Sequence, residues 1–285
     1  MNAQLPIGVF DSGIGGLTVL KALLARLPNE TFLYLGDTAR LPYGTKTAAT
    51  VERYALQAVD ELTRRGVKAL VIACNTASAA ALPALQAAHP ELLIIGVIEP
   101  GAAAAVAASK SGRIAVLATE GTVRGGAYQR EILRLAPQAT VTSIPATLFV
   151  ALAEEGWTEG QVAAATAHRY LAPLLVDPAR APDVLVLGCT HFPPLAAVIQ
   201  HEAGEGIRIV DSAMTTAGAL AGLLGARGLD APARAVAAAA VDGSRAGNDA
   251  ACRFLVTDGE ERFARVGPLF LGQPIAPGRI ERIDL

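Results

Sequence analysis

Two cysteines, Cys74 and Cys189, stand in similar surroundings far apart in the chain, in ACNTAS (73–78) and GCTHFPP (188–194). Each follows an apolar run and precedes helix-forming sequence, so we expect each thiol at the N-terminus of a helix. There the helix dipole and the unpaired N–H groups favour the thiolate and bring the thiol pKa toward neutral pH. Two such thiols facing each other across a cleft suit proton exchange at one carbon. One thiolate removes a proton, and the other thiol supplies one to the opposite face.

Other kinds of cysteine chemistry fit the spacing less well. A redox pair usually has the Cys-x-x-Cys spacing, which the sequence lacks, and a zinc site needs more ligands than Cys189 and His191 supply. No metal is therefore expected, and a hydrolytic nucleophile would require one cysteine rather than two. The third cysteine, Cys252 in AACRFLV (250–256), lacks this polar context and is expected in the core. A buried, inert thiol is also the alternative for either of the other two taken alone.

The segment FDSGIGG (10–16) presents polar groups after another apolar run. Asp11 with its neighbour Ser12 could receive an ammonium group or polarise a proton, or could cap the following helix. A nucleotide-binding Gly-x-Gly-x-x-Gly loop would need glycine at position 18, where Thr18 stands, and the Asp11 carboxylate would repel phosphate. Nucleotide binding is therefore not expected.

Further polar groups are suited to the recognition of carboxylates. The turn in GDTARLPYG (36–44) can offer backbone N–H groups to one carboxylate, and it consists of Pro42, Tyr43 and Gly44. Donors for a second carboxylate are Asn75, Thr76, Thr190 and His191. The place of His191 two residues after Cys189 suits a catalytic role as well as a structural one.

The elements that must position these residues are short apolar runs alternating with Ala- and Leu-rich stretches. Runs that are apolar on both faces and separated by helical sequence are typical of parallel strands with crossover helices. Ligands bind beyond the carboxyl ends of such strands, so the residues after each run are the functional candidates. The expected strands are 7–10, 31–36, 69–73, 92–98, 113–118, 140–144, 183–188 and 207–210, with one more strand and a helix in 251–272.

The two halves of the sequence resemble each other. IGVFDSG (7–13) is similar to IAVLATEG (114–121), and LVIACNTAS (70–78) is similar to LVLGCTHFP (185–193). A repeat of domain length predicts an α/β fold of two similar doubly wound parallel-sheet domains facing each other across a cleft. The alternative is that parallel strands simply look alike. We expect a first domain of residues 1–97 plus 212–285 and a second of 98–211, with the active site between them. The first helix of the second domain should follow GVIEPG (96–101).

Composition limits the class of protein. The chain has 285 residues, of which 52% are hydrophobic, and a formal net charge of -2. These values predict a folded core and give no basis for binding to nucleic acid or acidic membranes. AVAAAAV (235–241) is too short to span a bilayer, and MNAQLPIGVF (1–10) does not have the pattern of a signal peptide. Three cysteines argue against a disulfide framework, so a cytoplasmic protein is expected.

Five blocks of the sequence resemble glutamate racemase, within the cofactor-independent aspartate/glutamate racemases. They are GVFDSGIGGLTVL (8–20), GDTARLPYG (36–44), ACNTAS (73–78), GVIEPGA (96–102) and GCTH (188–191). The cysteine motifs alone indicate the broad group, whereas the first block combined with PYG indicates glutamate. The resemblance implies an enzyme that needs no cofactor, interconverts L- and D-glutamate and supplies D-glutamate for bacterial peptidoglycan. A homodimer is the expected assembly.

The resemblance also implies roles for single residues. Cys74 would take the Cα proton of D-glutamate and Cys189 that of L-glutamate. Asp11 and His191 would assist the thiols, as would Glu154 in LFVALAEEG (148–156), although the adjoining Glu155 leaves that assignment open. The implied substrate-binding residues are Asp11, Ser12, Pro42, Tyr43, Gly44, Asn75, Thr76, Thr119, Thr122, Thr190 and His191.

Three other functions remain as alternatives. A racemase for aspartate or another amino acid would share the cysteine motifs, although PYG argues against it. A racemase using pyridoxal phosphate needs a Schiff-base lysine, and the lysines Lys21, Lys46, Lys68 and Lys110 lie in no convincing pocket motif. A non-catalytic module that binds amino acids would have no need of two activated thiols.

Overall fold

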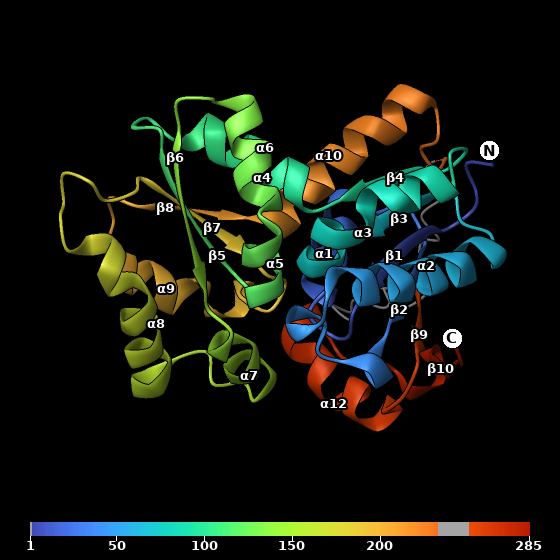
Figure 1. Ribbon diagram of the computed structural model, residues 1–285. Coiled ribbons are helices and arrows are strands. Elements are labelled where there is room, and N and C mark those ends of the chain that lie inside the picture. Colours follow the sequence, from blue (N-terminus) through green and yellow to red (C-terminus); the bar gives the residue numbers. More distant parts are fainter. Residues whose placement is uncertain (1, 233–250) are drawn as a thin grey trace, which may run out of the picture.

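The computed structural model describes residues 2–232 and 251–285, which fold around two separate parallel sheets (Figure 1). The segment AVAAAAV (235–241) lies outside the described residues. Within the described ranges, no helix combines the length and apolar character needed to cross a membrane.

The first sheet has the strand order β10-β9-β2-β1-β3-β4, and every pair of neighbours is parallel. Its central strands are buried on both faces, as their apolar runs predict. The sequence did not indicate β10, because this edge strand has three residues, two of them charged, and no apolar run. The strands are β1 (Ile7–Asp11), β2 (Phe32–Gly36), β3 (Ala69–Ile72), β4 (Leu93–Gly96), β9 (Cys252–Val256) and β10 (Ile280–Arg282).

The second sheet has the order β6-β5-β7-β8, again all parallel. If β1 is matched with β5 and β3 with β7, this order equals the β2-β1-β3-β4 part of the first sheet. The similarity between the two halves of the sequence therefore corresponds to equivalent strands in two sheets of equal topology. The strands are β5 (Arg113–Ala118), β6 (Thr140–Pro145), β7 (Val184–Gly188) and β8 (Arg208–Asp211).

Helices cover both faces of the first sheet, because alternate strand residues face opposite sides. Val9 shares a core cluster with Leu20 of α1, whereas the next residue, Phe10, shares another with Val59 of α2 and Leu85 of α3. Cys252 is buried at the start of β9, as predicted. The helices that pack in this part are α1 (Leu17–Arg26), α2 (Ala48–Arg64), α3 (Asn75–Ala88), α10 (Ser212–Arg227) and α12 (Glu260–Leu271).

The remaining helices surround the second sheet (Figure 1). One of them, α4, begins at Ile98 inside GVIEPG rather than after it. The expectation of a later start was wrong because Pro100 falls in the first turn, where its missing N–H disrupts no helical hydrogen bond. The helices are α4 (Ile98–Ala108), α5 (Glu120–Gly125), α6 (Ala127–Leu135), α7 (Leu148–Glu154), α8 (Gly160–Leu175) and α9 (Ala196–Ala203).

Two helices, α4 and α10, follow the points where the chain passes from one sheet to the other. Helix α10 packs against both α1 and α4. The strands of the first sheet come from residues 7–96 and 252–282, and those of the second from 113–211. The division at residues 97/98 and 211/212 itself remains a proposal.

Candidate functional site

The predicted site residues follow equivalent strands in the two sheets. In the first, β1 lies between β2 and β3, so the chain leaves β1 toward one side and later returns on the other. Asp11 ends β1 and Cys74 follows β3, while Thr119 follows β5 and Cys189 follows β7. Such points, where the strand order reverses, are where open α/β sheets bind ligands.

Both thiols open on one cavity of about 370 Å³. It combines residues from the carboxyl ends of both sheets with the turn after β2 and with α7. Two predicted residues, Asp11 and Thr122, lie behind its wall rather than on it. The predicted residues that line it are Ser12, Pro42, Tyr43, Gly44, Cys74, Asn75, Thr76, Thr119, Glu154, Cys189, Thr190 and His191. Lining residues that the sequence did not indicate are Leu41, Thr45, Thr147, Val150 and Ala151.

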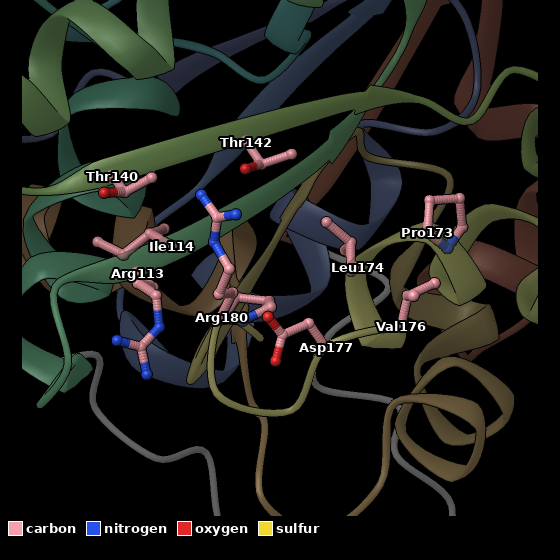
Figure 2. Close-up of a pocket in the computed structure, with 10 residues that line it drawn as sticks. Arg113, Ile114, Thr140, Thr142, Pro173, Leu174, Val176, Asp177 and Arg180 are labelled. Atoms are coloured by element: carbon pink, nitrogen blue, oxygen red, sulfur yellow. The ribbon is translucent and has the colours of Figure 1, made fainter.

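A second cavity lies at the opposite end of the second sheet, around the start of β5 and β6 (Figure 2). Arg113 and Thr140, which begin these strands, line it together with Arg180 and Asp177. It holds no thiol or imidazole. The proton-transfer groups that the sequence predicts are therefore gathered in the cavity between the sheets.

Cys74 occupies the N-cap position of α3, as predicted. Its Sγ accepts from the Ala77 N–H at 3.4 Å and donates to Ser12 Oγ at 3.4 Å. The expectation of a pKa near neutrality is nevertheless wrong. Burial and the neighbouring Asp11 carboxylate raise the pKa of Cys74 to about 12, because their effect exceeds that of the two hydrogen bonds. Cys74 is therefore a protonated thiol at neutral pH.

Asp11 is completely buried beside this thiol. Its Oδ2 accepts from the Gly13 N–H at 2.8 Å and from the Tyr34 hydroxyl at 3.4 Å. Burial raises the pKa of Asp11, although His191 and backbone N–H groups oppose that effect. Asp11 is not the N-cap residue of the next helix, because that position in α1 is Gly16, but the Gly16 N–H is among the groups that lower the pKa of Asp11. Tyr34, which lies inside a buried strand, gave no sequence signal of this contact.

Cys189 has different surroundings, and its expected place at a helix N-terminus is wrong. A turn and a short 3-10 helix at Pro193–Leu195 separate it from α9. Its Sγ lies 4.0 Å from His191 Nδ1, and His191 Nε2 lies 3.0 Å from Glu154 Oε1. Glu154 Oε2 in turn accepts from Arg262 Nη2 of α12 at 2.6 Å. Glu155 is exposed at the end of α7, so the geometry selects Glu154 as the partner of the imidazole.

The series Cys189–His191–Glu154–Arg262 places a positive charge, that of His191, next to Cys189. Burial by itself lowers the pKa of His191, but the hydrogen bonds and charges of Cys189 and Glu154 raise it to about 10. The same hydrogen bond to His191, with help from Arg262, lowers the pKa of Glu154. His191 is therefore an imidazolium at neutral pH, and the Cys189 sulfur lies next to its positive charge.

The glycine-rich segment after β1 contacts the loop that carries His191. A Cβ atom added at Gly15 would collide with the His191 ring, and the Thr18 hydroxyl donates to the Thr190 carbonyl at 3.1 Å. Glycine thus allows the close approach of two loops from different units. The GIGG sequence has this packing role here rather than a role in cradling phosphate.

The turn at Pro42–Gly44 is held from behind by a buried carboxylate that the sequence analysis did not single out. Asp37 Oδ2 accepts from the Tyr43 hydroxyl at 2.5 Å and from Arg40 Nε at 2.6 Å, and its Oδ1 accepts from Thr257 at 3.0 Å. Asp37 belongs to the quoted motif GDTARLPYG, but its contact with Thr257 could not be predicted because that partner lies 220 residues away.

On its other side, the turn meets the second unit. A Cβ atom at Gly44 would lie 2.9 Å from the Thr119 Cβ. The hydroxyls of Thr76, Thr119 and Thr122 lie within 2.9–3.2 Å of one another and link the two units there. Thr122 therefore supports the cavity wall through Thr76 and Thr119 rather than facing the cavity.

The described residues offer little for a metal or a lysine-bound cofactor. In the ranges 2–232 and 251–285, no three His, Cys, Asp or Glu side chains gather into a group that could hold a metal ion. All four lysines lie in these ranges, and none lines the cavity. Lys68 is buried elsewhere, where it pairs with Glu30 at 2.6 Å.

Comparisons with known proteins agree with this geometry. Residues 7–220 match the family model Asp/Glu/Hydantoin racemase. The glutamate racemase of Geobacter metallireducens is 47% identical over 93% of this chain and 92% of its own length. The crystal structure of a glutamate racemase isoform from Bacillus anthracis superposes with a TM-score of 0.87 at 33% identity, over 100% of this chain and 99% of that one. The enzyme of Francisella tularensis, solved with D-glutamate, gives a TM-score of 0.86 at 34% identity, over 99% and 98% of the two chains.

The fold of two α/β units and these matches place the chain among the racemases, which are isomerases. The chain belongs to the Asp/Glu/hydantoin racemase family, and within it to the glutamate racemases.

Proposed function

We propose that this protein interconverts L- and D-glutamate by transferring protons between two thiols at Cα, without a cofactor. The observation that carries the proposal is the arrangement of Cys74 and Cys189, which come from equivalent strands of the two sheets and line one cavity. They are close enough for charge on Cys189 to contribute to the raised pKa of Cys74.

The reaction needs one thiolate and one thiol in each direction. The thiolate takes the Cα proton and becomes a thiol, which leaves a carbanion. The opposite thiol then donates its proton to the other face of that carbon and becomes a thiolate, so atoms and charge balance. Cationic His191 lies next to Cys189, and burial keeps Cys74 protonated. This state suits removal of the proton of L-glutamate by Cys189 and protonation by Cys74, and the reverse direction starts from the opposite state.

The polar groups around the cavity supply the remaining functions. Asp11 and Ser12 act beside Cys74, whereas His191 and Glu154 act beside Cys189. The backbone of the turn at 42–44 and the side chains of Asn75, Thr76, Thr119 and Thr190 bind the two carboxylates of glutamate. The D-glutamate complex of the Francisella tularensis relative supports glutamate as the ligand.

The wider setting follows from the family resemblance. The D-glutamate formed would enter bacterial peptidoglycan, which links the protein to cell-wall biogenesis and cell shape. The enzyme would act in the cytoplasm as a homodimer, with no membrane or nucleic-acid partner. Light scattering on the purified protein would test the dimer.

The direct test follows the circular-dichroism signal of L-glutamate with purified protein and no added cofactor. We expect the signal to decay to zero as the racemic mixture forms, and L-aspartate to react at least a hundredfold more slowly. Alkylation of Cys74 and Cys189 by iodoacetamide should abolish activity, and glutamate should protect both thiols. A stable L-glutamate signal, or faster reaction of aspartate, would contradict the proposal.

A further inference from the structure

Asn75 is the first residue of α3, directly after Cys74, and it is 2% exposed on the cavity wall. Its Oδ1 accepts a hydrogen bond from the Tyr128 hydroxyl at 2.8 Å. Its Nδ2 is buried and has no hydrogen-bond partner. Leaving a buried amide nitrogen unpaired is costly, so this N–H₂ group needs an acceptor. Tyr128 does not line the cavity, and the amide nitrogen is therefore the polar end of Asn75 that can serve a ligand there.

The partner of this amide comes from the other unit. Tyr128 lies on α6, which packs beside the second sheet, and it is 2% exposed. A Cβ atom at Gly188 would lie 3.0 Å from Tyr128 Cε2, and one at Gly101 would lie 3.2 Å from its hydroxyl oxygen. The ring is therefore confined between α4 and the end of β7, immediately before Cys189.

The hydroxyl has a defined direction as well as a defined place. Burial raises the pKa of Tyr128, although the Ser212 side chain opposes this effect, so the hydroxyl keeps its proton at neutral pH. Tyrosine has one hydroxyl proton to donate. The 2.8 Å bond takes that proton to Asn75 Oδ1, while the Ser212 hydroxyl donates its own proton to the Leu187 carbonyl at 3.4 Å.

We propose that Tyr128 is a positioning residue for the substrate, because its hydroxyl holds the Asn75 amide with Oδ1 turned away and Nδ2 turned toward a substrate carboxylate. The reverse orientation would present a carbonyl oxygen to an anionic group and repel it. The bond also joins the two thiol-bearing units, since Asn75 adjoins Cys74 and Tyr128 packs beside Gly188. This inference rests on the proposed function in taking glutamate as the ligand.

The test is a double-mutant cycle between the two residues. Tyr128→Phe keeps the ring and removes the hydroxyl, and we expect KM for glutamate to rise about tenfold with a smaller change in kcat. Combined with Asn75→Ala, the same change should cost no more than a further twofold, because the tyrosine acts through the amide. Multiplication of the two losses, or a Tyr128→Phe enzyme within twofold of wild type, would overturn the proposal.

Two further variants serve as a control for the loss of a tyrosine hydroxyl and as a test of the amide orientation. Tyr170→Phe removes a tyrosine hydroxyl from the same unit. Among the described contacts this hydroxyl accepts only from the Leu148 N–H, so the variant should leave KM unchanged. Asn75→Asp still accepts from Tyr128 but replaces the N–H₂ donor by oxygen, so it should raise KM more than Asn75→Ala does. Wild-type behaviour of Asn75→Asp would contradict the amide orientation even if Tyr128→Phe failed to fold.

A binding measurement separates this inference from the proposed function. Calorimetric titration of each variant with D-glutamate should reproduce the KM pattern as a pattern in Kd. A wild-type protein that binds glutamate without racemising it would refute the proposed function, while the Kd ratios would still decide the role of Tyr128.

Discussion

The two thiols follow equivalent strands of a repeated fold, yet their surroundings have opposite character. Cys74 caps a helix and contacts Ser12, but burial and Asp11 raise its pKa to about 12. Cys189 has no helix directly behind it and instead lies beside His191, which Glu154 and Arg262 support. The comparison shows that a repeated backbone does not produce two equal bases. One thiol is kept neutral beside a carboxylate, and the other is placed next to a cation.

The largest expected effect comes from removing either thiol. Cys74→Ala and Cys189→Ala should each lower kcat/KM by roughly 10³–10⁴-fold in both directions, because every turnover uses both groups. Cys252→Ser is the matched control and should keep nearly full activity, since that thiol is buried in the core. Steady-state assays from L- and from D-glutamate measure both rates. Substantial activity in either alanine variant, or a hundredfold loss in folded Cys252→Ser, would mean that the chemistry lies elsewhere.

Solvent isotope transfer tests whether the two thiols act on opposite faces. In deuterated water the donating thiol has exchanged its proton, so product should carry deuterium at Cα from the first turnover, while unreacted substrate stays mostly protonated. Mass spectrometry of the separated enantiomers at low conversion gives both quantities. Protonated product would indicate that a single base removed and returned the same proton.

A smaller effect is expected in the pH dependence of kcat/KM, which should report the charge on His191 beside Cys189. A bell-shaped profile of kcat/KM is expected for the wild type, because each direction needs one thiolate and one thiol. The folded-state pKa of His191 is raised to about 10. Its cation is therefore complete below the ordinary value of about 6.5 and is lost as the pH rises toward 10.

Because the His191 cation is lost at lower pH than the Cys74 proton, it should set the alkaline limb of that profile. Glu154→Gln should lower the pKa of His191 and move this limb down by about one unit. Glu155→Gln changes the exposed neighbour in the same way and should leave the profile in place. An unchanged profile in Glu154→Gln, or an equal shift in both variants, would remove Glu154 from the assignment.

The smallest effect is expected at Arg262, which is 46% exposed. Because exposed ion pairs contribute little, Arg262→Gln should change the free energy of unfolding by less than about 1 kcal/mol and kcat/KM by about twofold at most. Chemical denaturation and steady-state kinetics measure these values. A tenfold loss of activity with unchanged stability would show that Arg262, the last member of the series Cys189–His191–Glu154–Arg262, is needed for catalysis.

The sequence was sufficient to predict most of the strands and most of the polar residues that line the cavity, because these depend on local patterns. Apolar runs placed β5 at its observed bounds and the other predicted strands within about two residues. The small polar residues after those runs lie at one cavity because carboxyl ends of parallel strands meet at one edge. The short β10 and the start of α4 were not predicted, since one lacks an apolar run and the other contains a proline.

The supporting contacts could not be predicted, because both partners were ordinary residues when seen separately. Asp37 meets Thr257 across 220 residues, and Tyr128 meets Asn75 across 53. Neither Thr257 nor Tyr128 belongs to a motif. The sequence could not distinguish Glu154 from its neighbour Glu155. The structure does, because at the end of α7 only the Glu154 carboxylate points toward His191.

By itself, the sequence determined the class of fold, the repeat, the two thiols and the family, since each follows from residue types at short spacing. The tertiary structure alone decided the charge state around each thiol. A pKa depends on burial and on charges that other segments bring within a few ångströms. The helix position that predicted an acidic Cys74 thiol was correct, but the burial of Cys74 beside Asp11 outweighed it.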